Sequence, residues 1–227
     1  MFLDRSASSR VDALTRQLFH DSIQKIAAGA LPCRGDRVHA YLLYAFTPGA
    51  AYRADLENNV RAARTQGVPG GQASAERARE RTQTSALRRR ARAALFRLAD
   101  SVPIGHSHTL RTDLLGSLEV ASEQLAAAPA GRPVRIYYFS DMHESMRGAG
   151  RRDFDARPPR DRAEAHRWAD ADVALVRGMN VDPRRLARAE IQVIMGTLSN
   201  RPTAVAVEAY WRRLFSRLGV ADANIHY

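Results

Sequence analysis

The sequence has little of three features that define common protein classes: cysteine, lysine and long apolar runs. Cys33 is the single cysteine, which excludes an internal disulfide framework and a zinc site built from several cysteines. The longest apolar runs, 41–46 and 204–207, are far too short to span a bilayer. The chain also does not open with a charged segment and an apolar one, as a secretion signal does. The sequence therefore favours neither a disulfide scaffold nor a membrane-spanning protein.

Arginine is what the chain has in excess. Lys25 is the only lysine among 35 basic residues, which stand against 24 acidic residues and give a net charge of +11. A GC-rich coding sequence explains this bias more simply than a large set of phosphate contacts does. Hydrophobic residues make up 45% of the chain, which is ample for a core and excludes wholesale disorder. A length of 227 residues fits one domain, 1–227.

Apolar strands alternate with amphipathic helices along the chain. The pattern predicts strands at 1–3, 38–46, 134–139, 189–196 and 223–227, and helices near 11–29, 74–100, 114–125 and 200–219. Because the strands are continuous apolar runs, this arrangement is typical of a mostly parallel sheet with helices on both faces. The sequence therefore predicts an α/β, doubly wound, Rossmann-like fold. In such folds ligands lie beyond the carboxyl ends of the central strands.

Two arginine-rich segments interrupt this alternation. Residues 47–73 are predicted to be irregular, and with the helix after them they form a basic loop-plus-helix insertion over 47–100. Residues 142–172 are predicted to form an arginine-rich mobile loop with a short helix near its end. Solvated polar surface is the simpler interpretation of both segments. The sharper one is contact with an anion or a partner, through Arg88, Arg89, Arg90, Arg92, Arg151 and Arg152.

Five oxygen-bearing residues stand after predicted strands or at the start of a predicted helix. They are Asp4, Ser6, Ser8, Thr112 and Asp141. Each one alone is explained well as a helix cap. Together they offer two carboxylates and three hydroxyls, the hard oxygen donors that suit a small dication such as Mg²⁺. The sequence therefore predicts a metal site at the carboxyl-end edge of the sheet.

These residues carry a resemblance to a known family. Asp4-Arg5-Ser6-Ala7-Ser8 resembles the DxSxS signature of von Willebrand factor A domains, the first motif of their metal-ion-dependent adhesion site. The segment from Thr112 to Leu118 resembles the second motif, and Phe139-Ser140-Asp141 resembles the third. The whole chain resembles a bacterial branch of this family in its order of elements. The resemblance implies that Asp4, Ser6 and Ser8 hold Mg²⁺ (or Mn²⁺ or Ca²⁺) directly or through water. Thr112 would join them in the liganded state, and Asp141 would act mainly through a bound water.

The chain departs from the family pattern in two places. Only three residues precede Asp4 in what should be the central strand, from which we expect a native chain that extends upstream. The basic segment 47–100 stands where the family has a short edge strand and a helix. The location stays open between the cytoplasm, which the sequence slightly favours, and attachment through an upstream signal or anchor.

The predicted function is metal-dependent binding of a protein that presents an acidic side chain, without catalysis. The alternative is an arginine-mediated nucleic-acid or anionic-surface binder on the same scaffold, since a fold does not settle a function. Phosphoester hydrolysis is the weakest reading, because Asp4 and Asp141 are fewer carboxylates than such metal sites use. The sequence identifies neither the partner nor the oligomeric state.

Overall fold

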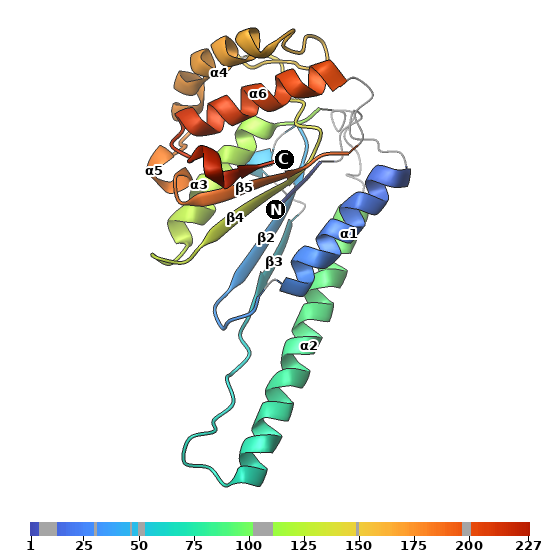
Figure 1. Cartoon of the computed structure of the whole chain (residues 1–227), viewed down its shortest axis with the longest axis vertical. Helices are drawn as coiled ribbons and strands as arrows, with labels where there is room; N and C mark the ends of the chain where they lie inside the picture. Colours follow the sequence, from blue (N-terminus) through green and yellow to red (C-terminus); the bar gives the residue numbers. More distant parts are fainter. Residues whose placement is uncertain are drawn as a thin grey trace.

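A six-stranded sheet forms the centre of the computed structural model, which describes residues 1–4, 13–29, 31–45, 47–49, 53–101, 111–148, 150–196 and 201–227 (Figure 1). The strands are β1 Phe2–Asp4, β2 Arg37–Leu43, β3 Arg53–Glu57, β4 Val134–Phe139, β5 Ala189–Ile194 and β6 Ile225–His226. Their order is β3-β2-β1-β4-β5-β6, and every neighbouring pair is parallel except β2 and β3. The prediction of an α/β fold with a mostly parallel sheet is confirmed.

The central strands send alternate side chains into two separate cores. Phe2 stacks on Tyr41 and Tyr138 on one face, with ring centroids 5.7 Å and 5.1 Å away. Leu3 and Phe139 point to the opposite face. Because successive residues of a strand face opposite sides, an unbroken apolar run is what a sheet buried on both faces requires.

Helices cover both faces of the sheet (Figure 1). The face of Leu3 packs against α1 (Ala13–Gly29) and the carboxyl-terminal part of α2 (Gly70–Asp100). The face of Phe2 packs against α3 (Leu114–Ala127), α4 (Arg162–Arg177), α5 (Pro183–Leu186) and α6 (Arg201–Arg217). Two short 3-10 helices, η1 (Thr47–Gly49) and η2 (Asp222–Asn224), complete the described elements. In the part of the chain that the structure describes, none of the helices is long and apolar enough to cross a membrane.

The two arginine-rich segments contain more regular structure than the sequence predicts. The stretch 47–73, predicted to be irregular, includes η1, edge strand β3 and the first residues of α2. The stretch 142–172 includes the first eleven residues of α4, a helix of 16 residues that packs on α6. The short helix predicted near the end of 142–172 is the first part of α4. Strand β3 was not predicted, because charged residues interrupt its apolar pattern.

Helix α2 extends far beyond the sheet (Figure 1). Its carboxyl-terminal end is anchored by Leu95 and Leu98, which are buried in the core with residues of the sheet and α1, and Ala91 is buried as well. The amino-terminal half projects away from the body, with the extended segment after β3 running beside it. The buried residue of this half is Ala73.

Candidate functional site

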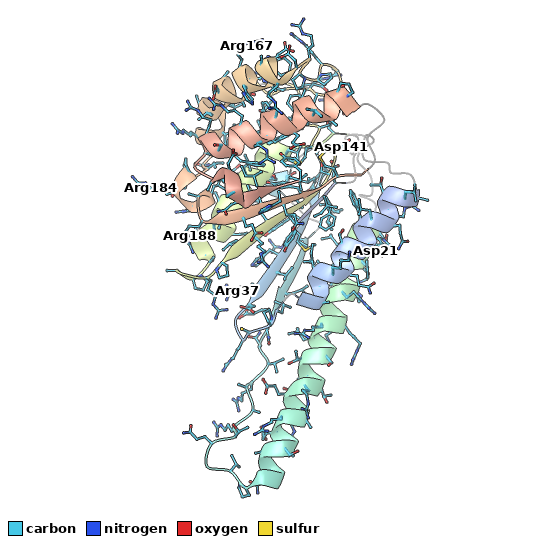
Figure 2. All side chains as sticks on the ribbon, in the orientation of Figure 1. Asp21, Arg37, Asp141, Arg167, Arg184 and Arg188 are labelled. Carbon is cyan, nitrogen blue, oxygen red and sulfur yellow. The ribbon has the colours of Figure 1, made fainter. Side chains whose placement is uncertain are left out.

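The carboxyl ends of β1 and β4 bring two of the predicted metal ligands to one edge of the sheet. Asp4 is the last residue of β1, and Asp141 follows β4 by two residues. Since β1 and β4 are parallel neighbours, both residues lie at the same edge. Figure 2 places Asp141 at this edge, and Arg37 at the opposite end of the sheet, where β2 begins.

The Asp4 carboxylate is buried, with 2% of the residue exposed, and it is held by hydroxyl groups from two other segments. The Ser140 Oγ donates a hydrogen bond of 2.6 Å to Asp4 Oδ2. The Thr112 Oγ1 donates a longer one, of 3.4 Å, to Asp4 Oδ1. Ser140 also accepts a 2.9 Å bond from the Met142 N–H, which fixes the turn after β4. Three oxygen-bearing side chains that are far apart in the sequence therefore meet in one place.

Thr112 is positioned by the segment that follows Asp141. Its backbone N–H donates to Ser145 Oγ at 2.7 Å, and its carbonyl accepts from the Ser145 N–H at 3.1 Å. Both residues are buried. The loop after β4 thus fixes Thr112, which lies two residues before the start of α3.

A buried ionic network holds the start of α3. Glu144 Oε2 accepts hydrogen bonds from the N–H groups of Leu114 and Leu115, at 2.7 Å and 3.1 Å. Asp113 caps the same helix end through Gly116 N, at 2.7 Å. The Arg151 guanidinium pairs with both Glu144 and Asp113, and its side chain is 12% exposed. Burial raises the pKa of Glu144 to about 7, against the opposing effect of the Arg151 charge.

His143 lies close to Asp141 and joins two parts of the loop that follows β4. Its backbone N–H donates to Asp141 Oδ1 at 3.1 Å, and its ring Nδ1 lies 3.2 Å from Asp155 Oδ1. Burial opposes protonation of the ring. The hydrogen bond with Asp155 and the charges of Asp141 and Asp4 outweigh it, so the pKa of His143 is raised. The two candidate carboxylates therefore both act on one imidazole.

Helix α6 anchors the loop from the other side. The Trp211 Nε1 donates a 2.7 Å hydrogen bond to the Met142 carbonyl, and Trp211 is fully buried. Met142 has a φ of 61°, a left-handed conformation that side chains other than glycine rarely adopt. This unusual backbone turn is held in place by Ser140 and Trp211 together.

The predicted metal ligands have three different outcomes. The structure brings Asp4 into contact with Thr112, and it places Asp141 at the same edge of the sheet. Ser6 and Ser8 lie outside the described residues. Ser140 and Ser145 were not singled out in the sequence, although Ser140 directly precedes Asp141, which was the one available signal.

The predicted arginine contacts divide into two groups. The first group is exposed on α2 and has no ion-pair partner within the described residues: Arg88, Arg89, Arg90 and Arg92. The second group is engaged inside the domain. Arg151 belongs to the network at α3. Arg152 makes two hydrogen bonds to Asp172, of 2.6 Å and 2.8 Å, and lies 4.6 Å from the Trp168 ring centre.

The donor set at this edge consists of oxygens. Among the described residues, no group of three or more His, Cys, Asp or Glu side chains is arranged to hold a metal ion. The predicted site calls for only two carboxylates, with hydroxyls as the other donors. Buried Asp4 and the Thr112 hydroxyl beside it fit the hard oxygen ligands of a small dication.

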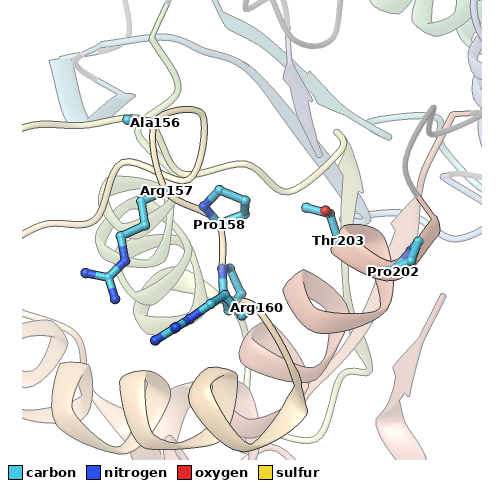
Figure 3. A pocket seen from close by; sticks show the side chains of 7 residues that line it. Ala156, Arg157, Pro158, Arg160, Pro202 and Thr203 are labelled. Atoms are coloured by element: carbon cyan, nitrogen blue, oxygen red, sulfur yellow. The ribbon is translucent and has the colours of Figure 1, made fainter.

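An open depression lies between residues 156–160 and the start of α6 (Figure 3). Its lining consists of Ala156, Arg157, Pro158, Pro159, Arg160, Pro202 and Thr203. Pro158 and Thr203 face each other across it. Arg157 and Arg160 both pair with Glu164 at 3.2 Å, so their charges are already balanced by a neighbouring carboxylate.

Comparisons of the chain with protein-family models, with curated proteins and with solved structures found no match.

Proposed function

We propose that this chain is a metal-dependent protein-binding module with the doubly wound architecture of a von Willebrand factor A domain. The observation that carries the proposal is the buried Asp4 carboxylate, whose two oxygens accept hydrogen bonds from Thr112 and Ser140. The strand order supports the proposal. The chain passes from β1 to β2 on one side of β1, whereas β4 lies on its other side. The strand order therefore reverses at β1, and ligands of α/β sheets bind where the order reverses.

The residues that would hold Mg²⁺, or Mn²⁺ or Ca²⁺, are Asp4, Thr112 and Asp141, together with Ser6 and Ser8. With few protein charges around it, a bound dication would supply positive charge that an acidic side chain of a partner could approach. Asp4 provides a buried charge in this set.

The surrounding residues contribute rigidity. Ser140 orients one oxygen of Asp4, and Ser145 fixes the backbone of Thr112 on both sides. Glu144 and Arg151 hold the beginning of α3, which follows Thr112 directly. A binding site that is preorganised in this way loses less free energy to ordering when a partner binds.

We propose binding without catalysis, because the site brings together two carboxylates and hydroxyl groups. Among the described residues, the imidazole of His143, beside Asp141, is engaged with Asp155. Metal-dependent hydrolysis of phosphoesters uses more carboxylates, often around two metal ions.

Metal titration tests the proposal. Addition of Mg²⁺ or Mn²⁺ should raise the melting temperature of the full chain, because a ligand that binds the folded state alone stabilises it. Asp4→Asn keeps the size and one acceptor oxygen of the side chain but removes its charge. This variant should fold, as far-ultraviolet circular dichroism will show, and should lose the metal-induced shift.

The control variant is Asp21→Asn, which removes an exposed carboxylate on α1 (Figure 2). It should keep the full metal response. A parent protein that shows no shift with either metal would overturn the proposal, as would an Asp4→Asn variant that responds like the parent.

A further inference from the structure

The projecting part of the molecule has a composition unlike the rest of the chain. We define the arm as residues 58–92, which comprise the extended segment after β3 and most of α2. The arm starts at the buried Asn58, whose side-chain amide donates to the Leu31 carbonyl at 2.8 Å. It ends at Arg92, next to the buried Ala91. Between these anchors, the segment after β3 and the amino-terminal half of α2 extend away from the sheet (Figure 1).

The arm holds most of the excess charge of the protein. Nine arginines and two glutamates give it a net charge of +7, out of +11 for the whole chain. All nine arginines are exposed: Arg61, Arg64, Arg77, Arg79, Arg81, Arg88, Arg89, Arg90 and Arg92. Within the described residues, Arg79 is the one arginine of the arm with a carboxylate partner, Glu76 at 3.5 Å. The arm therefore presents positive charge that the domain itself does not balance.

The two acidic side chains of the arm are less exposed than its arginines. Glu80 Oε2 accepts a 3.1 Å hydrogen bond from the Ala63 N–H, so it faces the extended segment that returns beside the helix. Glu76 and Glu80 are both half-buried, whereas the arginines are exposed. Glu80 therefore helps to join the helix of the arm to the extended segment, and the basic residues face solvent.

Four of the arginines lie in one row along α2. At about 100° per residue, positions 77, 81, 88 and 92 fall within about 60° of one another around the helix. At about 1.5 Å per residue, this row is about 22 Å long, the axial length of about six or seven base pairs of a nucleic-acid duplex. The helix of the arm thus carries a row of arginines whose length matches several successive phosphates of a duplex backbone.

The arm lacks aromatic residues and large exposed apolar residues, and this restricts the anionic ligands that it could bind. Binding of single-stranded nucleic acid relies on aromatic side chains that stack on bases, and residues 58–92 contain no aromatic residue. Helices that insert into membranes need an exposed apolar face. The large exposed hydrophobic residues of the described chain, Leu14, Leu18, Val205 and Tyr227, all lie outside the arm.

We propose that the arm docks on the phosphate backbone of double-helical nucleic acid, without reading the bases. Arginine guanidinium groups make charge-assisted, often bidentate, hydrogen bonds to phosphate oxygens. Such contacts position a protein on a duplex and carry no sequence information by themselves. This activity is separate from the metal site, which lies at the carboxyl-end edge of the sheet.

The test measures binding of the full chain to a labelled DNA duplex and a labelled RNA duplex by fluorescence anisotropy, between about 50 and 200 mM salt. A single strand of the same sequence and vesicles with anionic lipids are the comparison probes. We expect duplex binding that weakens steeply with salt and is unchanged by chelator. Comparison of the DNA duplex with the RNA duplex shows which of them residues 58–92 prefer.

The diagnostic variant carries Arg81→Gln, Arg88→Gln and Arg92→Gln, which remove three guanidinium groups of the row and keep good helix formers. Loss of three phosphate contacts should make the salt dependence shallower by about 2.7 in the slope of log K against log salt, on B-DNA. The matched control carries Arg162→Gln, Arg167→Gln and Arg177→Gln, which remove the same charge from exposed positions on α4. It should keep the slope of the parent.

Three results would overturn the proposal. One is that the parent does not bind either duplex at low salt. Another is that the control variant loses as much slope as the arm variant, which would make net charge the cause. The third is that single strands or vesicles bind as tightly as the duplexes. None of these results concerns the metal response, so the two proposals fail independently.

Discussion

At the scale of single residues, stability should be most sensitive to substitutions in one buried network. This network consists of Glu144, Arg151 and Asp113. Glu144 accepts hydrogen bonds from two backbone N–H groups of α3, and the Arg151 guanidinium pairs with both buried carboxylates, Glu144 and Asp113. A buried ion pair is costly to break from one side, because the remaining charge stays buried without its partner. The network therefore fixes α3 and the segment beside Thr112 at the same time.

A double-mutant cycle should reveal this coupling. We expect Glu144→Ala and Arg151→Ala each to lower the free energy of unfolding by about 3 to 5 kcal/mol. The double variant should lose less than the sum, because the contact between Glu144 and Arg151 is lost in each single variant and is therefore counted twice in the sum. Urea denaturation of the four proteins measures the three differences, and strict additivity would contradict the assigned network.

A second prediction at this scale concerns pH. Hydrogen bonds from the Arg160 side chain and backbone, with the charge of Arg157, hold the pKa of Glu164 at about 2, below its ordinary value of 4.5. A lowered pKa means that the folded state favours the charged form. This stabilisation is complete above pH 4.5 and is lost as the pH falls towards 2.

The measurement compares the free energy of unfolding at about pH 6 and about pH 3 for the parent and for Glu164→Gln. The parent should lose more stability than the variant over this interval, because the variant has no charge to neutralise. Equal losses in both proteins would contradict the assignment of the low pKa to Glu164.

At the scale of elements, α1 approaches the end of β5 closely. A Cβ atom added at Gly196 would lie 2.1 Å from Thr15 Cγ2 and 2.5 Å from Thr15 Oγ1. Because Thr15 is a short, branched side chain on α1, it cannot move aside without a shift of the helix. Gly196 therefore sets the distance between α1 and the sheet.

Gly196→Ala should lower the free energy of unfolding by about 1 to 3 kcal/mol, the usual cost of overpacking. Gly29→Ala is the matched control, because a Cβ at the end of α1 would meet nothing within 4 Å. The control should be neutral or slightly stabilising. Thermal unfolding of both variants measures the difference, and a neutral Gly196→Ala would contradict the close approach.

Elements were predictable from the sequence where burial on both faces imposes an unbroken apolar run. Strand β4, 134–139, has the predicted bounds for this reason. Strand β3 was missed because Arg53–Glu57 alternates charged and apolar residues at the edge of the sheet, where one side remains half-exposed. Helix α2 begins before the predicted Ser74, since Gly70 and Gly71 are typical of loops and yet belong to its first turn.

The candidate site divides in the same way. Asp4, Thr112 and Asp141 could be proposed from the sequence, because parallel strands bring their carboxyl ends to one edge. The contact of Ser145 with Thr112 and the pairing of Arg151 with Asp113 join residues 33 and 38 positions apart. No local pattern encodes such pairs, since only the folded chain brings them together.

At the scale of the whole molecule, the arm and the metal site depend on different parts of the core. The tip of the arm, residues 64–79, contributes the buried residue Ala73 and no other buried side chain. Ala63 and Glu80 are hydrogen-bonded to each other, so the chain ends left by removing the tip lie close together.

Replacing residues 64–79 by a short glycine-serine turn should leave the fold intact. We expect the melting temperature to change by less than about 4 °C, which corresponds to about 1 kcal/mol for a chain of this size. The metal-induced shift should remain, because the site lies at the far edge of the sheet. Differential scanning calorimetry with and without Mg²⁺ measures both quantities, and loss of cooperative unfolding would show that the arm supports the core.

The position of β1 in the sheet also bears on how the protein folds. Phe2 pairs with Tyr41 and Tyr138, which lie 39 and 136 residues further along the chain. Strands β2 and β3 can pair locally, and β4 can join β5 after one crossover, but both halves need β1 between them. During synthesis this strand leaves the ribosome before both of its partners, and β4 is made much later than β2. We expect its insertion to be a late and slow event, since the closure of such distant contacts limits folding rates.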